Sequence, residues 1–141
     1  AALPMGGAVS TVAGTNWMLI GDAAACVNPL NGEGIDYGLE TAALAVSLLG
    51  ATADFTSVWP QVLRAHYGAA FMLARTLARA LTYPQFLPTL GPVALRGPLM
   101  KAAARLMGNL VTEQDKDLVA RAWRLAGCAA LAAHRNSPLW D

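Results

Sequence analysis

Charged residues are scarce in this sequence. They make up 13% of the 141 residues, and ten Lys and Arg against nine Asp and Glu leave a formal net charge of +1. This balance argues against a dedicated nucleic-acid binder, which needs a positive surplus to meet the phosphates. Hydrophobic residues reach 55%, which excludes intrinsic disorder. A chain of this length is expected to form one domain with a real core.

Cysteine and long apolar runs are also lacking. Cys26 and Cys128 provide neither a disulfide framework nor metal-site spacing, and we expect both to be small buried residues in a reducing cytoplasm. His66 and His134 have no Cys, Asp or Glu at ligand spacing, so no metal site is predicted. The longest apolar run near the end, LAGCAALAA, is far shorter than the ~20 residues of a spanning helix. The start shows no signal-peptide pattern.

The pattern further along predicts a short β region and then helices. The run NWMLI (16–20), which ends at Gly21, is typical of a strand buried on both faces. Three prolines and a glycine predict that 82–92 is irregular or composed of turns. Apolar residues at helical spacing predict helices over 35–49, 57–81, 98–110 and, from a cap at Thr112, to Ala133. Either the β region pairs with a segment outside this sequence, or the fold is mostly a helical bundle.

The stretch GDAAACVNPLNGEGIDYGLE (21–40) carries the chemistry. Asp22 follows the predicted strand, at the place where α/β proteins bind ligands, and its carboxylate can accept hydrogen bonds from the hydroxyls of a nucleotide cofactor. Gly32 and Gly34 let the main chain approach a ligand closely. The helix that starts at Ile35 offers N–H groups and partial positive charge to an electron-rich group. On the residues alone, a loop whose glycines serve only turns stays open as an alternative.

The same stretch resembles the second flavin-binding motif of the para-hydroxybenzoate-hydroxylase-like FAD oxidoreductases. In that motif a strand ending in GD is followed by small residues, a Pro, a G-x-G and a helix. The form NPLNGEGIDYGLET is most similar to the geranylgeranyl reductase branch, which saturates isoprenoid double bonds. LPMGG upstream and PLMKAAARLMGNLVTEQDKDL downstream also resemble the C-terminal part of that branch.

This resemblance implies an α/β parent with the Rossmann-like FAD-binding fold, of which this chain is a mainly α-helical part with a short β region at its N-terminus. Residues 1–50 would complete the FAD-binding domain, and residues 51–141 would form a C-terminal helical region. The family begins with a G-x-G-x-x-G unit for the FAD pyrophosphate, and no such fingerprint occurs here. The resemblance therefore implies missing N-terminal FAD-binding and substrate segments, without which this part is expected to be inactive.

The resemblance implies FAD as the cofactor and eight residues around it. Asp22 would bind the ribityl chain, while Pro29 and the backbone of 32–35 would flank the ring, with the helix start facing N1–C2=O. The implied cofactor-binding residues are Gly21, Asp22, Pro29, Asn31, Gly32, Glu33, Gly34 and Ile35. Glu33 is expected to fix the loop, and Tyr37 and Glu40 to serve packing and the surface. No residue is identified as a proton donor.

By the same resemblance, FADH2 would deliver a hydride to an alkene carbon of a prenyl lipid, and a proton would complete the saturation. An aromatic monooxygenase or halogenase with the same GD loop stays open, as does a non-enzymatic helical interaction domain. A lipid substrate must be collected from a bilayer, so Lys101 and Arg105 are interpreted as facing lipid headgroups in a peripheral contact at the inner face of the membrane. Met100 and Met107 on the same helix are expected to pack in the core, or else to line an apolar tunnel for a prenyl chain.

Overall fold

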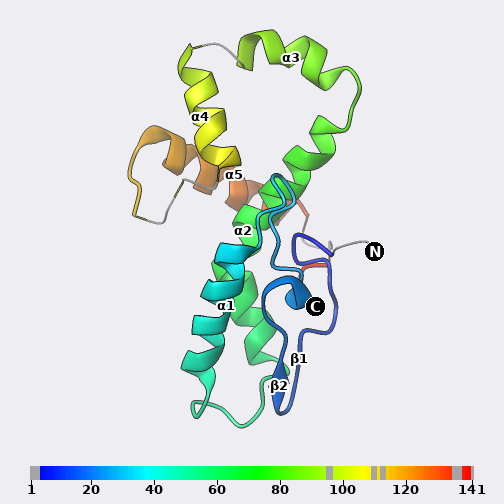
Figure 1. Cartoon of the computed structure of the whole chain (residues 1–141), viewed down its shortest axis with the longest axis vertical. Coiled ribbons are helices and arrows are strands. Elements are labelled where there is room, and N and C mark those ends of the chain that lie inside the picture. The colour runs from blue at the N-terminus through cyan, green and yellow to red at the C-terminus, as the bar shows by residue number, and fades with distance from the viewer. Residues whose placement is uncertain (1–3, 95–96, 109–110, 112–113, 135–137, 141) are drawn as a thin grey trace.

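The computed structural model describes residues 4–94, 97–108, 111, 114–134 and 138–140. In this part of the chain the elements follow in a simple order, with a small hairpin and a 3-10 helix before the α-helices. They are β1 (Ala13–Gly14), β2 (Trp17–Met18), η1 (Gly21–Ala24), α1 (Ile35–Leu48), α2 (Val58–Leu81), α3 (Phe86–Ala94), α4 (Gly97–Met107) and α5 (Leu118–Ala133). Figure 1 shows α2 as the long central helix, with α1 beside one end and α3 and α4 at the other.

The β region is a hairpin and not a buried strand. β1 and β2 pair antiparallel, with Ala13 opposite Met18 and Gly14 opposite Trp17. The prediction of a strand over 16–20 buried on both faces is wrong, because Trp17 is 43% exposed and Ile20 40%. A Cβ at Gly14 would collide with the Trp17 indole, so the glycine lets this ring fold back over the hairpin. Asp22 therefore lies in η1 and not at the end of a strand.

Two of the predicted helices, α1 and α2, match the periodicity closely. Pro60 lies in the first turn of α2, where its missing N–H loses no helical hydrogen bond. Ser57 occupies the N-cap position without a side-chain bond. The prediction that 82–92 is irregular or composed of turns holds for 82–85, which form turns and a bend, and is wrong from Phe86, where α3 begins. Pro88 falls in its first turn, where no partner is lost, and only Pro92 stands inside the helix.

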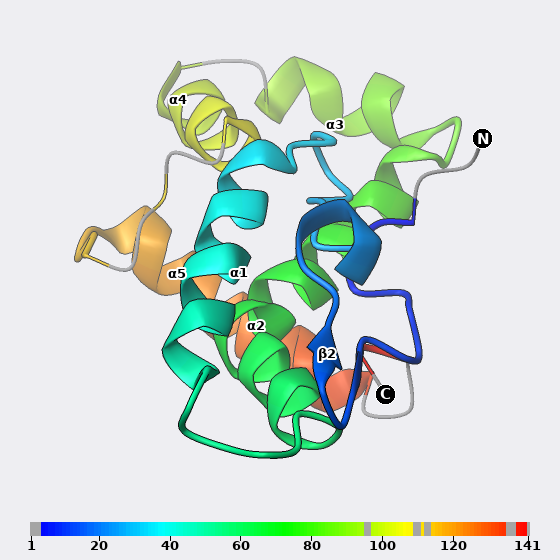
Figure 2. The ribbon, with the colours of Figure 1, turned by 60° about the horizontal axis from the view of Figure 1, so that its bottom comes forward.

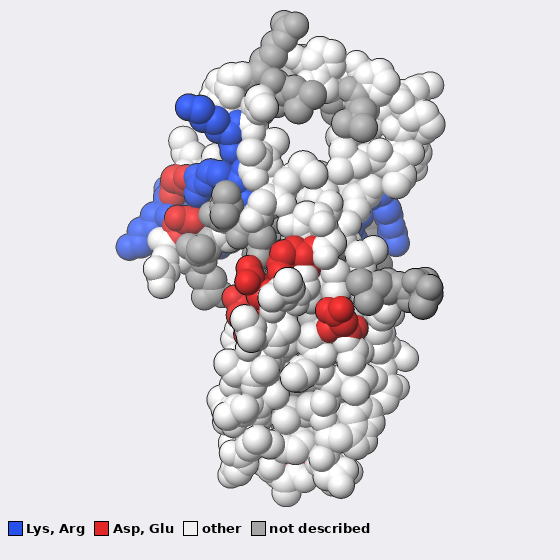
Figure 3. Space-filling model, viewed as in Figure 1, with Lys and Arg blue, Asp and Glu red and all other residues white. Residues whose placement is uncertain are grey.

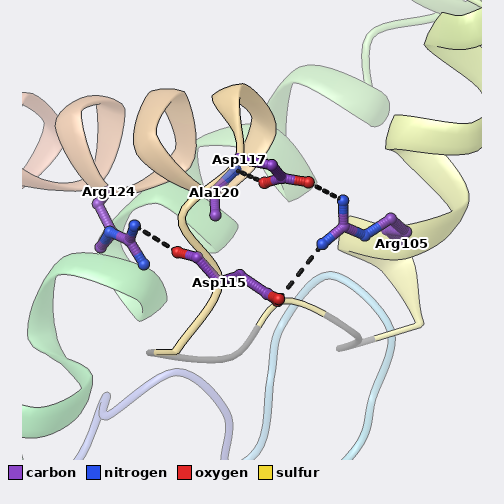
Figure 4. A network of polar contacts seen from close by, with 5 residues as sticks. All are labelled: Arg105, Asp115, Asp117, Ala120 and Arg124. Atoms are coloured by element: carbon purple, nitrogen blue, oxygen red, sulfur yellow. Dashed lines mark hydrogen bonds and ion pairs between the residues drawn. The ribbon is translucent and has the colours of Figure 1, made fainter.

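The start of α5 is set by Asp117. Its Oδ1 accepts a hydrogen bond from the Ala120 N–H at 2.9 Å, which is the N-cap geometry. The predicted cap at Thr112 lies outside the described residues, and the helix begins later than predicted because Asp117 supplies the capping oxygen. Arg105 of α4 pairs with Asp117 and, at 3.3 Å, with Asp115, so the two helices are joined here (Figure 4).

This ion-pair network corrects the interpretation of α4. The Arg105 guanidinium faces two carboxylates and not a lipid headgroup. Met100 and Met107 are 53% and 47% exposed, so the expectation that they pack in the core is wrong. Their spacing on one face is real, but that face looks outward. Within the described residues, no helix is both long and apolar enough to cross a membrane.

The network makes the stability of this junction depend on pH. Arg105 lowers the pKa of Asp117, and the Ala120 N–H adds to the effect. A depressed folded-state pKa stabilises the fold fully above the unfolded value of about 4, and this contribution is lost as the pH falls through the folded value. We expect Asp117→Asn to lower the urea midpoint near neutral pH, and to lower it progressively less as the pH falls below about 4. An equal loss at both pH values would contradict this account.

The core lies where α2 meets α1, η1 and the end of the chain. Tyr37 of α1 packs edge-on against Phe71 of α2, with ring centroids 5.0 Å apart. Gly127 lets α5 approach α2, since a Cβ there would lie 3.0 Å from the Ala69 carbonyl oxygen. The largest fully buried side chains include Trp59, Trp140, Phe71, Leu63 and Leu139. Figure 2 shows η1 beside α1, the arrangement that builds the site.

Candidate functional site

Two glycines seat η1 directly on α1. Gly21 has φ +53°, and its N–H donates to the Thr41 hydroxyl at 3.0 Å. A Cβ at Gly21 would lie 3.3 Å from the Cα of Gly38, so a side chain at Gly21 would push η1 away from α1. Asp22 is thereby held beside the first turns of α1, although no strand positions it.

Cys26, just after η1, is buried as predicted, whereas Cys128 is exposed and that prediction is wrong. Burial raises the pKa of the Cys26 thiol to about 12, and the charge of Asp22 adds to the effect. The group therefore stays a thiol at neutral pH, and a nucleophilic role next to the GD motif is excluded.

The loop from Asn28 to Gly34 is held by its own polar groups. The Asn28 N–H donates to the Glu33 carbonyl and the Gly32 N–H donates to the Asn28 carbonyl, both at 2.8 Å. The Asn31 Oδ1 accepts from the Glu33 N–H at 2.9 Å. Gly32 closes the turn with φ +75°, a conformation that favours glycine. The bend is thus fixed without any bulky side chain.

Glu33 caps α1. Its Oε1 accepts the Asp36 N–H at 2.9 Å, while Oε2 is buried with no hydrogen-bond partner among the described residues. One N–H of the first helical turn is therefore already satisfied by the protein. The remaining partial positive charge of the helix start lies beside Gly34, which is the N-cap residue.

A cavity of about 360 Å³ opens between η1, this loop and α1. Asp22 stands in its wall, and a Cβ at Gly34 would lie only 2.9 Å from the Asp22 Oδ1. A Cβ at Gly32 would meet nothing within 4 Å. Within the described part of the chain the Asp22 carboxylate forms no hydrogen bond or ion pair. The protein's own side chains leave the bend clear, with an uncompensated carboxylate at its edge.

The cavity gathers most of the residues expected from the sequence. Those that line it are Gly21, Asp22, Gly32, Gly34 and Ile35, joined by Val27 and Gly38. Pro29, Asn31 and Glu33 are not among its lining residues. The Asn31 Nδ2 instead donates to the Met107 carbonyl at 2.6 Å and so joins the loop to α4. Gly38 was missed, although a glycine inside a helix, four residues after Gly34, signals a close approach.

Comparisons with known proteins first indicate a class. No family model matches the chain, and no solved structure matches it significantly. Curated proteins that do match are reductases by name.

The menaquinone reductase of Mycolicibacterium smegmatis is 60% identical over 141 residues, which cover 98% of this chain and 34% of that protein. The menaquinone reductase of Mycobacterium tuberculosis H37Rv is 59% identical over 139 residues, with the same coverage. The chain thus spans about a third of the length of the curated relatives it matches. It is similar to one part of these menaquinone reductases.

Proposed function

We propose that this chain is the C-terminal part of a flavin-dependent reductase that acts on a prenyl lipid of the menaquinone type. The observation that carries the proposal is the Asp22 carboxylate, which lines a cavity that Gly32 and Gly34 keep clear of side chains. The substrate class comes from the names of the relatives.

The residues present fit a flavin. The Asp22 carboxylate would accept hydrogen bonds from ribityl hydroxyls, and the start of α1 would face the electron-rich edge of the reduced ring. When bound, FADH2 supplies the hydride. This chain contributes orientation: the hydrogen bonds of Asn28 and Asn31 fix the bend before any ligand arrives. Pyrophosphate binding would come from a segment that precedes this sequence, within an α/β FAD-binding parent.

An exposed apolar face of α1 supports such preceding segments. Ile35, Val46 and Leu49 are 81%, 65% and 62% exposed. A contiguous helical face of this kind is usually covered, because its exposure to water is unfavourable. In the proposed parent, the FAD-binding and substrate segments would cover it.

A peripheral membrane contact is proposed for α4. Leu99 and Met100 are 56% and 53% exposed beside Lys101, which is the arrangement of a helix that lies on a lipid surface. Such a contact would place the enzyme at the inner face of the membrane. Cosedimentation of the protein with anionic vesicles measures this contact. Protein that stays in the supernatant would contradict the proposed membrane contact.

The activity test must separate two reductions, because menaquinone carries both a quinone ring and a prenyl side chain. The resemblance to geranylgeranyl reductases favours the side-chain double bond. We expect the complete reading frame, purified with FAD and reduced without oxygen, to add two hydrogens to menaquinone. The mass of the two added hydrogens should remain on the menaquinone after its ring is reoxidised with ferricyanide, and mass spectrometry measures this. A gain that reoxidation reverses marks a quinol and would contradict the proposal, as would hydroxylation of an aromatic acid in air.

A further inference from the structure

A second and larger cavity, of about 810 Å³, runs along α1 on the face turned away from η1. Asp36, Glu40, Ala43 and Ser47 line it at helical spacing, opposite Gly38 and Thr41, which face η1. Its apolar walls come from α1, α2, the end of α4, Val111 in the segment that follows α4, and α5. They are formed by Leu39, Ala43, Leu44, Ala70, Leu106, Val111 and Trp123. We call this cavity the α1 groove; its volume falls in the range of ligand pockets.

The α1 groove is elongated and begins beside the proposed flavin site. Asn28 lines one end and belongs to the same loop as Gly32, which lines the smaller cavity. From Asp36 to Ser47 the helix rises about 16 Å. A ligand in the groove would therefore extend away from the bend along α1.

The walls are fixed by contacts within the protein. Tyr67 packs edge-on against Tyr37, with ring centroids 5.6 Å apart, and against Phe71, with centroids 5.8 Å apart. On the other side, the Asn31 amide binds the Met107 carbonyl next to Leu106. The groove is thus preformed and not a chance gap between loose helices.

The charges around the groove select against an anionic ligand. Asp36 and Glu40 are exposed at its rim, and the described lining residues include one histidine, His66, and no Lys or Arg. In Figure 3, acidic atoms lie across the middle of this face, while Lys and Arg atoms lie above them, next to further acidic atoms near α4 and α5 and also at the opposite edge. A diphosphate headgroup would be repelled by this rim. A neutral apolar chain carries no charge for this rim to repel.

We infer that the α1 groove receives the polyprenyl tail of a neutral lipid quinone, with the reacting end of the molecule at the Asn28 end. The inference rests on the proposed function and adds to it the position of the tail and the exclusion of prenyl diphosphates. Ala43 and Ala70 have the smallest side chains of the lining, so bulk can be added at these positions to block the groove.

The test places a large side chain in the groove. Ala43 is exposed on α1, so Ala43→Phe fills space without disturbing the core. Ala129→Phe, at an exposed position of α5 away from the lining residues, is the matched control. In the complete protein we expect Ala43→Phe to raise KM for a long-tailed menaquinone about tenfold or more, and to leave KM for the one-isoprene homologue unchanged. FAD content and melting temperature should match those of Ala129→Phe.

Binding is measured separately from turnover, by quenching of protein fluorescence with the same two quinones. Suppose that the unmodified enzyme reduces menaquinone, and that Ala43→Phe has the same KM and the same affinity as the unmodified enzyme for the long-tailed quinone. The groove inference is then overturned, and the proposed function stands. If the unmodified enzyme reduces no menaquinone, the proposed function fails, and weaker binding of the long-tailed quinone to Ala43→Phe still supports the groove. Tighter binding of a prenyl diphosphate than of menaquinone overturns the charge argument. Should Ala43→Phe fold poorly, Ser47→Phe blocks the far end and is read in the same way.

Discussion

Replacing Trp140 by Ala is expected to lower the free energy of unfolding by about 3–5 kcal/mol. The indole is 1% exposed and packs on Phe71 and Tyr67, with centroids 5.6 and 6.4 Å away. Its Nε1 also donates to the Ala24 carbonyl at 2.7 Å, so the substitution leaves both a cavity and an unpaired buried carbonyl. Urea unfolding followed by far-UV circular dichroism measures the loss.

Two further variants divide this effect between packing and hydrogen bonding. Trp140→Phe keeps most of the ring but removes the donor to Ala24, and should lower the free energy of unfolding by about 1–3 kcal/mol. Trp17→Ala removes a tryptophan that is 43% exposed, and should change it far less. Similar losses for Trp17→Ala and Trp140→Ala would show that the end of the chain is not part of the core.

The role of Trp140 also shows what a sequence cannot reveal. The hydrogen bond joins residues 116 positions apart, and no periodicity or motif connects a tryptophan at the end of the chain with the backbone of η1. By contrast, α1 and α2 follow from spacing within each segment and were predicted nearly to the residue. Local patterns specify local elements, while the packing that supports the GD motif is long-range.

Signals that were present but misinterpreted account for other differences. The number of prolines in 82–92 suggested a break, but their position decided the outcome, because Pro88 falls where α3 needs no N–H donor. At the start of α5, the sequence pattern predicts a cap at Thr112, whereas Asp117 supplies the capping oxygen. The spacing of Met100 and Met107 correctly placed both on one face of α4, but spacing alone does not tell whether that face packs in the core or is exposed to solvent.

The two cavities differ in how far they could be predicted. Five of the eight expected site residues line the smaller one, because a single continuous segment builds it and the glycines mark where side chains are excluded. The α1 groove draws its walls from α1, α2, α4 and α5. Its existence depends on how helices far apart in the sequence lie against each other, and no motif announces it. Only Asn28 belongs to both the recognised loop and the groove.

Gly34→Ala is expected to weaken flavin binding in the complete protein about tenfold to a hundredfold while leaving the fold intact. Gly34 has φ −140°, which any residue adopts, so the substitution strains no backbone dihedral. The added Cβ would lie 2.9 Å from the Asp22 Oδ1 and 3.2 Å from a methyl group of Val27. The Asp22 carboxylate is the free end of an exposed side chain and will rotate away, so the position that ribityl hydroxyls would use is lost.

The matched control is Gly38→Ala, in the same cavity wall. A Cβ at Gly38 meets no protein atom within 4 Å, and Ala favours the helix interior by about 1 kcal/mol over Gly. We expect this variant to gain thermal stability and to keep its flavin, whereas Asp22→Asn should weaken binding to about the same extent as Gly34→Ala. Flavin titration followed by absorbance and fluorescence measures all three. If Gly34→Ala and Asp22→Asn bind flavin normally, the carboxylate at the clear bend is not a flavin ligand, because both variants remove it from the one place where the structure presents it.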